Sequence, residues 1–312
     1  MLLSFIFAQS EVQEAAAEHF NAGETIIEHV SNSSHASPLL TLPRIFGIDF
    51  SVTKHVFMLW LVAAIVFIAV TWSVRRYLKQ ERLIPSGFMN GLEAVVEYVR
   101  DSIVQPNVGT KWVRTWTPLI LTLFFFILGA NAIGSIPIFD VVALIDHFVL
   151  RTGSESFIAK LIHGGTTATA NFNVTAALAT ITFGSIIVAG SRAHGFVKHW
   201  KNIVPRGLHP LVYVLLIPIE IIGMFVRPFA LTMRLAANMT GGHIAILAIL
   251  SFVFLFTEMF GRAIAGIGVG LLVSVPLAVG ISALEIIVVL VQAYVFTLLS
   301  AVFIGMAIHA HH

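Results

Sequence analysis

The chain has 312 residues, of which 57% are hydrophobic and only 11% charged. About a quarter of the residues in a soluble domain are charged, so this composition excludes a soluble protein and indicates a protein that lies in lipid. Cysteine is absent, which excludes disulfides and Cys-ligated metal sites. The net charge of +2 is too small to indicate a nucleic-acid partner.

Residues 1–53 are predicted to form a polar N-terminal extension outside the membrane, and residues 54–312 a single membrane domain. Leu2 to Ala8 is a short apolar run with no Lys or Arg before it, which is a poorly formed signal-peptide pattern. Between residues 9 and 53 the chain is mixed and carries five Glu residues. This acidic segment is expected in water.

The first predicted span is Val56 to Val74, about the ~20 residues that cross a hydrocarbon core. Four basic residues follow it at once: Arg75, Arg76, Lys79 and Arg82. Because loops on the inner side of a membrane are enriched in Lys and Arg, the N-terminus is expected outside.

Residues 88–104 have apolar side chains at helical spacing with charged residues between them, a stripe too polar to span. This segment is expected to lie on the inner surface. Trp116 to Ile136 and Asn171 to Gly190 are the second and third predicted spans. The third leads into a basic loop at 192–206, which agrees with the orientation of the first.

Two long apolar stretches follow, at 211–260 and 269–307. Even residues 228–260 would reach roughly 50 Å as a helix, well beyond a ~30 Å core. They are therefore predicted to be strongly tilted or bent helices. The sequence predicts an all-α integral membrane protein of about five to six membrane helices, the last two long, tilted and paired as an antiparallel hairpin.

Charged residues inside these last two stretches are the candidates for chemistry, because such groups are costly at bilayer depth and persist where they pair, line water or conduct ions. Arg234 and Asn238 are four residues apart and share a helix face, with Arg227 on nearly the same stripe. One face of this helix is therefore cationic. The alternative role for any one of these Arg residues is a salt bridge that holds the bundle together.

Glu285 and Gln292 are seven residues apart and share a face of the last helix. If Gln292 lies level with Arg234 in an antiparallel pair, Glu285 and His243 come close in depth. An imidazole and a carboxylate can relay protons there. In an ideal helix His243 faces away from Arg234, unless the pair Gly241-Gly242 rotates the backbone locally.

Other polar residues have simpler interpretations. Glu258 and Arg262 are spaced for a local ion pair at a helix end. Arg227 can extend toward the inner surface. The three terminal histidines, His309, His311 and His312, are read as a solvated tail rather than as a metal site.

The segment from Arg227 to His243, Arg-Pro-Phe-Ala-Leu-Thr-Met-Arg-Leu-Ala-Ala-Asn-Met-Thr-Gly-Gly-His, resembles the most recognisable part of the stator a subunit of F-type rotary ATP synthases. The resemblance extends over about residues 88–308. Further matching positions are Pro218-Ile-Glu220, Asn131 to Pro137, Thr169 to Thr175, and Glu285 through Gln292. At Gly134 some members have an acidic residue instead, so no direct channel role is expected for that span.

The resemblance implies that Arg234 is the essential arginine facing the ring of c subunits, supported by Asn238 and Gln292. It also implies that Glu220, His243 and Glu285 line two aqueous half-channels for protons. The implied partners are the c-ring, the b subunits of the peripheral stalk and the rest of the synthase, in a bacterial inner membrane. No cofactor, metal or catalytic site of its own is expected.

Two other functions fit part of the pattern. A proton-coupled secondary transporter also places Arg, His and Glu at the midplane, but such proteins usually contain repeats, and the sequence shows none. A passive membrane scaffold would not need so many costly charges at bilayer depth.

Overall fold

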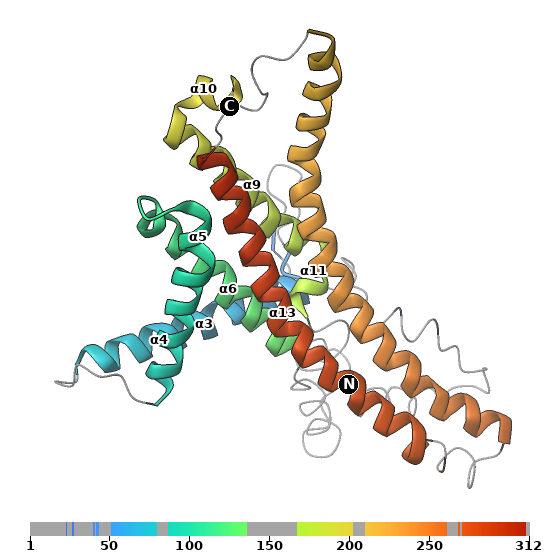
Figure 1. Cartoon of the computed structure of the whole chain (residues 1–312). Helices are drawn as coiled ribbons and strands as arrows, with labels where there is room; N and C mark the ends of the chain where they lie inside the picture. The colour runs from blue at the N-terminus through green and yellow to red at the C-terminus, as the bar shows by residue number, and fades with distance from the viewer. Residues whose placement is uncertain are drawn as a thin grey trace. The chain divides into compact units, whose positions relative to one another are not determined.

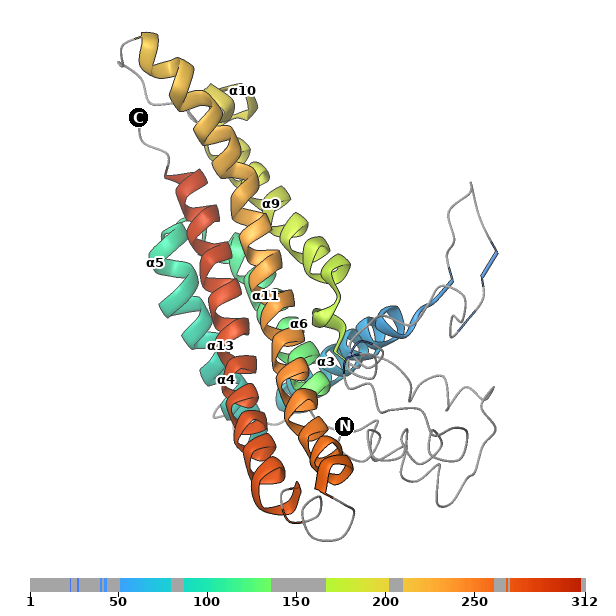
Figure 2. The same cartoon turned by 90° about the vertical axis from the view of Figure 1, so that its right-hand side faces the viewer.

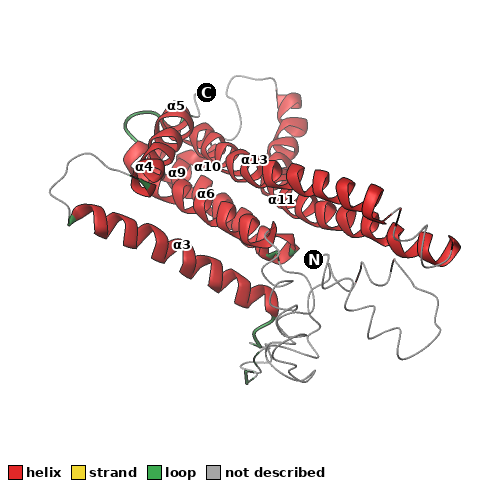
Figure 3. Ribbon diagram, turned by 90° about the horizontal axis from the view of Figure 1, so that it is seen from below, coloured by secondary structure: helices red, strands yellow, loops and turns green. Residues whose placement is uncertain are grey.

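The computed structural model describes residues 51–79, 87–135, 167–201, 210–260 and 270–309, with the isolated residues 23, 27, 40, 42, 43 and 268. Helices make up every regular element in these ranges, as Figure 3 shows by colour. Extended backbone pairs there at one isolated bridge, between Leu40 and Val52. The predicted all-α class is confirmed.

The described residues contain five helices long and apolar enough to cross a membrane. They form at the predicted places because each is an apolar run of at least the length of a hydrocarbon core. Figure 1 shows them as α3 (Lys54–Leu78), α6 (Val113–Ser135), α9 (Phe172–His194), α11 (Pro210–Phe260) and α13 (Val275–Ile308). The chain is thus an integral membrane protein.

Shorter elements lie between the spans. The segment predicted at 88–104 is helical, and it is not among the five helices that are long and apolar enough to cross a membrane. It is built from α4 (Phe88–Tyr98), a π-helical turn η1 (Val99–Val104) and α5 (Gln105–Val108). Gly109 ends it with φ 78°, a conformation that glycine adopts without a steric penalty. The remaining short elements are η3 (Ala168–Ala170), α10 (Phe196–Lys201) and η5 (Gly270–Ser274).

Helix α11 is continuous for 51 residues, through Pro218 and Pro228. At 1.5 Å per residue it is about 75 Å long, more than twice a ~30 Å hydrocarbon core. It cannot stand upright with its whole length in lipid. The strong tilt expected from the sequence stays a prediction.

The chain packs as two compact units, each built from parts of several helices. Unit 1 comprises Met1–Val62, Ala130–Asn171 and Ala237–Val289. Unit 2 comprises Ala63–Gly129, Phe172–Ala236 and Leu290–His312. The division predicted between residues 1–53 and 54–312 stays a prediction.

Unit 2 has an apolar core to which η1, α6, α9, α11 and α13 all contribute. Ile103, Ile120 and Leu235 are among its fully buried side chains. Small residues bring helices close together here: a Cβ added at Gly305 of α13 would overlap with the backbone carbonyl of Asn107 in α5. Close backbone approach at small residues is how membrane helices gain packing contacts.

Unit 1 contains the last part of α11 and the first part of α13. These two segments run side by side in opposite directions (Figure 2). The pairing of the two helices over their full length stays a prediction. A small apolar cluster of Met58 and Ala168 packs the start of α3 against η3. Apart from Gln292, which lies in unit 2, the buried polar side chains of the next section lie in this unit.

Candidate functional site

Arg234 lies on α11 in unit 2 with its side chain exposed. Leu231 and Leu235, on either side of it in sequence, are buried in the core and fix the rotation of the helix. Among the described residues, the Arg234 guanidinium has no ion-pair or hydrogen-bond partner. The charge therefore faces outward from unit 2.

Gln292 of α13 joins the two long helices at this point. Its side-chain Nε2 donates a hydrogen bond of 3.1 Å to the backbone carbonyl of Arg234. Gln292 is itself buried, whereas the Arg234 side chain is not. Because the bond goes to the backbone, it holds the helix and leaves all five N–H donors of the guanidinium free.

His243 of α11 and Glu285 of α13 form a buried pair in unit 1. Nδ1 of the imidazole lies 3.4 Å from Oε1 of the carboxylate, and both side chains are 7–8% exposed. Gly242 makes room for the carboxylate, since a Cβ there would lie 3.3 Å from Glu285 Oε1. The proximity expected from counting residues along two antiparallel helices is observed.

Thr167 holds the other nitrogen of the His243 ring. Its Oγ1 lies 2.6 Å from Nε2, and both groups are buried. The approach depends on Gly134 of α6, because a Cβ at that position would overlap with the Thr167 side chain. With one nitrogen at a hydroxyl and the other at a carboxylate, the ring has a defined orientation.

The segment around Thr167 is fixed by two more hydrogen bonds. Thr169 Oγ1 donates to Oδ1 of Asn131 at 2.5 Å, and Thr240 Oγ1 donates to the backbone carbonyl of Ala170 at 3.3 Å. Side chains from α6, α11 and α13 therefore meet η3 in one buried polar cluster. We call Asn131, Thr167, Thr169, His243 and Glu285 the polar cluster of unit 1.

The remaining candidates lie apart from these contacts. Glu220 is half-buried on α11 and Asn238 is exposed; neither side chain has an ion pair or hydrogen bond with another described residue. The Arg227 guanidinium lies 5.6 Å from the ring centre of Phe303, a cation–π contact within unit 2. The Glu258 side chain, Arg262, His311 and His312 lie outside the described residues, so their predicted roles stay predictions.

The backbone rotation considered at Gly241-Gly242 does not occur. Helix α11 continues through both residues, and neither has a positive φ. Arg234 is exposed and His243 buried. This is the outcome that an unbroken helix gives for positions nine residues apart, half a turn out of phase.

Several polar residues that sequence reasoning did not propose are buried in unit 1. They are Lys54, His55 and Thr167, together with Asn131 and Thr169, which were noted only as parts of matching motifs. An Asn in an apolar span is a signal that could have been used. Thr167 gives no such signal, because it lies outside any periodic segment.

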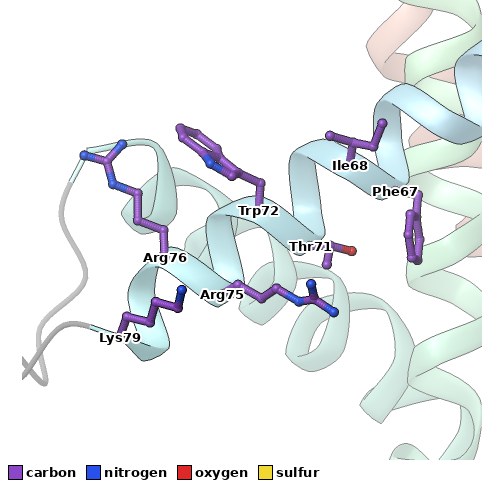
Figure 4. Close-up of a pocket in the computed structure, with 7 residues that line it drawn as sticks. All are labelled: Phe67, Ile68, Thr71, Trp72, Arg75, Arg76 and Lys79. Carbon is purple, nitrogen blue, oxygen red and sulfur yellow. The ribbon is translucent and has the colours of Figure 1, made fainter.

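A surface depression of about 680 Å³ lies elsewhere, on α3 in unit 2. Figure 4 shows its lining side chains, all from α3 except Lys79, which directly follows the helix; Trp72, Arg75 and Arg76 lie toward the helix end. The Arg76 guanidinium lies 5.3 Å from the Trp72 ring centre. Aromatic and basic side chains at a helix end are typical of the lipid headgroup level, and the lining has no imidazole or carboxylate.

No group of three or more His, Cys, Asp or Glu side chains that could hold a metal ion occurs within the described part of the chain. The chemistry available at the polar cluster is therefore that of hydroxyl, amide, imidazole and carboxylate groups. All of these groups bind water, and the imidazole and the carboxylate can also take up and release protons.

Comparison with known proteins decides the family. The sequence model described as ATP synthase A chain matches residues 56–305, most of the chain. The chain belongs to the ATP synthase subunit a family. Membership is supported over nearly the full length by curated relatives.

Three bacterial relatives serve as examples. The protein named ATP synthase subunit a 2 of Chlorobium luteolum is 38% identical over 306 residues, which is 96% of this chain and 79% of the relative. ATP synthase subunit a of Chlorobium phaeobacteroides is 38% identical, with 93% and 77% covered. That of Chloroherpeton thalassium is 39% identical, with 88% and 72% covered. The family is that of a membrane subunit of the synthase complex.

Proposed function

We propose that this chain is the proton-conducting stator subunit of a rotary F-type ATP synthase, which supplies two half-channels to a ring of c subunits. The observation that carries the proposal is the exposed Arg234 guanidinium, which has no partner among the described residues. A charge at bilayer depth costs at least ~2.5–3.5 kcal/mol unless it is compensated. A carboxylate on a neighbouring subunit would compensate it.

Arginine suits this position because its guanidinium stays protonated at any working pH. It attracts an arriving ring carboxylate and favours loss of the proton from that group. Because the guanidinium does not release its own proton, it also blocks direct passage between the two half-channels. Gln292 fixes the backbone at this level, and Asn238 is the proposed second support.

The two half-channels are assigned to different groups. His243 and Glu285 are proposed to line the outer one, because their buried contact can hold and pass a proton. Half-buried Glu220, on α11 in unit 2, is proposed to line the inner one.

A proton enters from outside, protonates a ring carboxylate, and travels almost a full turn through lipid. It leaves near Arg234 toward the inner side. The ring carboxylate must be neutral in lipid because an ionised one is too costly there.

In this function the chain has no catalytic site of its own. Its partners are the c-ring, the b subunits of the peripheral stalk and the rest of the synthase. The setting is the bacterial inner membrane with the N-terminus outside. That orientation is supported by Arg75 and Arg76 in the last turn of α3.

The test is Arg234→Ala in the complete synthase, measured as ATP-driven proton pumping in membrane vesicles. Pumping should fall to background while the subunit is still inserted and assembled. Met233→Ala is the matched control, since it shortens an exposed side chain in the same helical turn and should retain pumping. Normal coupling in Arg234→Ala would refute the proposal.

A second measurement separates the stator from a transporter. A stator subunit should copurify with a small, very hydrophobic ring subunit. If the purified chain instead moved a solute across a liposome membrane on its own, the transporter function would replace the proposed one.

A further inference from the structure

The surface depression on α3 changes from apolar to cationic along the helix axis. Phe67 and Ile68 line its apolar part, and the basic side chains line the part at the helix end (Figure 4). Thr71 and Trp72 lie between the two parts. The proposed proton path uses none of these side chains, so the depression needs an explanation of its own.

Helical spacing places the polar groups of the depression along one strip of surface. Thr71 is followed four residues later by Arg75, and Arg75 four residues later by Lys79. Residues three and four apart are neighbours on a helix surface. Figure 4 shows the Arg75 side chain extended along the helix toward Thr71. One hydroxyl and two cations therefore border the same part of the depression.

The cations of the depression are not compensated within the described part of the chain. Arg75 and Lys79 are exposed and have no ion pair or hydrogen bond with another described residue. The Arg76 guanidinium lies beside the Trp72 ring, 5.3 Å from its centre. No Asp or Glu is among the lining residues. The depression thus carries three positive charges and is complementary to an anion.

The apolar part indicates what kind of anion fits. Phe67 and Ile68 are 69% and 62% exposed, so the protein leaves most of their surface open. Ile68 lies about 10 Å from Arg75 along the axis, toward the middle of the span. A free phosphate ion would contact only the cationic part. A phospholipid has an anionic phosphate and an acyl chain in the same order as the two parts of the depression.

We propose that this depression binds an anionic phospholipid of the membrane leaflet that meets the basic end of α3. Its phosphate lies between Arg75 and Lys79, and one acyl chain lies along Phe67 and Ile68. A guanidinium binds phosphate through two parallel N–H donors, and an ammonium group binds it as a point charge. Basic clusters at the end of a membrane helix attract anionic lipids. Binding breaks no covalent bond and does not rest on the proposed function.

Photolabelling by lipids tests the site directly. The complete synthase is reconstituted into vesicles that contain either phosphatidylglycerol or phosphatidylcholine, each with the same photoreactive group in one acyl chain. Mass spectrometry of the digested subunit then measures the label on α3. Phosphatidylglycerol should label the helix around Phe67 and Ile68 several-fold more than phosphatidylcholine, because only the former has a net negative charge.

Two results of this comparison would overturn the proposal. Equal labelling by the two lipids would mean that the cations do not select the headgroup. An absence of label from either lipid would mean that a neighbouring subunit covers the depression. Addition of equimolar glycerol phosphate, which has the anionic group without an acyl chain, should leave the labelling unchanged. Effective competition by this ion would reduce the depression to a site for soluble anions.

A pair of double variants measures the contribution of the two cations. Arg75→Gln/Lys79→Gln should abolish the preference for phosphatidylglycerol. Lys111→Gln/Arg114→Gln is the matched control, because it removes two exposed cations of the same unit that do not line the depression. Lys111 even has a similar setting, since its Nζ lies 5.4 Å from the Trp112 ring centre.

The control variant should keep the preference for phosphatidylglycerol. A preference that persisted in Arg75→Gln/Lys79→Gln, or an equal loss in both double variants, would contradict a site at these two residues. If the first double variant does not assemble, Arg75→Gln alone and the comparison of the two lipids in the unaltered synthase still decide the matter. None of these readouts depends on proton flux, so failure here is distinct from failure of the Arg234 test.

Discussion

Nδ1 of His243 lies 3.4 Å from Oε1 of Glu285, and the opposite ring nitrogen lies 2.6 Å from the Thr167 hydroxyl. The imidazole is thus placed between an acid and a hydroxyl from two different parts of the chain. This arrangement suits a group that receives a proton on one side and gives it up on the other.

Glu285→Gln should slow proton conduction at least several-fold with little change in assembly. The amide has nearly the same size and still fills the space beside Gly242, but it cannot take up and release a proton. The measurement is passive proton flux in vesicles together with the amount of assembled subunit. An unchanged flux would remove Glu285 from the proton pathway.

Thr167→Val should also lower proton flux, while Thr167→Ser should keep it near the original level. Valine has almost the shape of threonine but lacks the hydroxyl that contacts His243, and serine retains it. Because Val fills the same space beside Gly134, a change in flux would report the lost hydrogen bond rather than a cavity. Equal flux in both variants would mean that Thr167 does not position the ring.

Gly305→Ala should destabilise unit 2 by about 1–3 kcal/mol, the usual range for overpacking a tight interior. The added methyl group would meet the backbone carbonyl of Asn107, which cannot turn aside as a side chain can. Gly184→Ala on α9 is the control, because nothing lies within 4 Å of a Cβ there. Thermal dissociation of the purified complex gives the comparison, and equal midpoints for the two variants would contradict the packing argument.

The spans could be predicted from the sequence because hydropathy alone decides them. The run expected at 56–74 became α3, Lys54–Leu78, and each of the other four lies within a few residues of its predicted place. The meeting of His243 with Glu285 was also predictable. A fixed helical rise and an antiparallel direction determine which residues share a level.

The sequence could not predict how the polar cluster of unit 1 is completed. Thr167 and Thr169 belong to a short segment without periodicity, and their partners are 76 and 38 residues away in the chain. Only the packing of η3 against α6 and α11 brings them together. The burial of His55 could not be predicted for another reason. A polar residue at the start of a span is ordinarily expected to lie at the membrane surface.

His199 gives a prediction outside the spans. It lies on α10, its ring is buried against Gly190 of α9, and burial together with the charge of His194 lowers its pKa below the ordinary value of 6.5. The unfolded segment therefore binds a proton more readily than the folded one. The free energy that holds α10 folded against α9 should therefore be largest above about pH 6.5. It should decrease as the pH falls toward the lower pKa of His199 in the folded state.

Amide hydrogen exchange of residues 196–201, corrected for intrinsic rates, measures this packing. Protection should fall between pH 7.5 and pH 5.5, values chosen to bracket the ordinary histidine pKa of ~6.5. In His199→Phe, which keeps an aromatic ring against Gly190 but cannot titrate, protection should be independent of pH over the same interval. A pH dependence that persisted in His199→Phe would assign the effect to His194 or another group, because the titrating imidazole at position 199 would no longer be present.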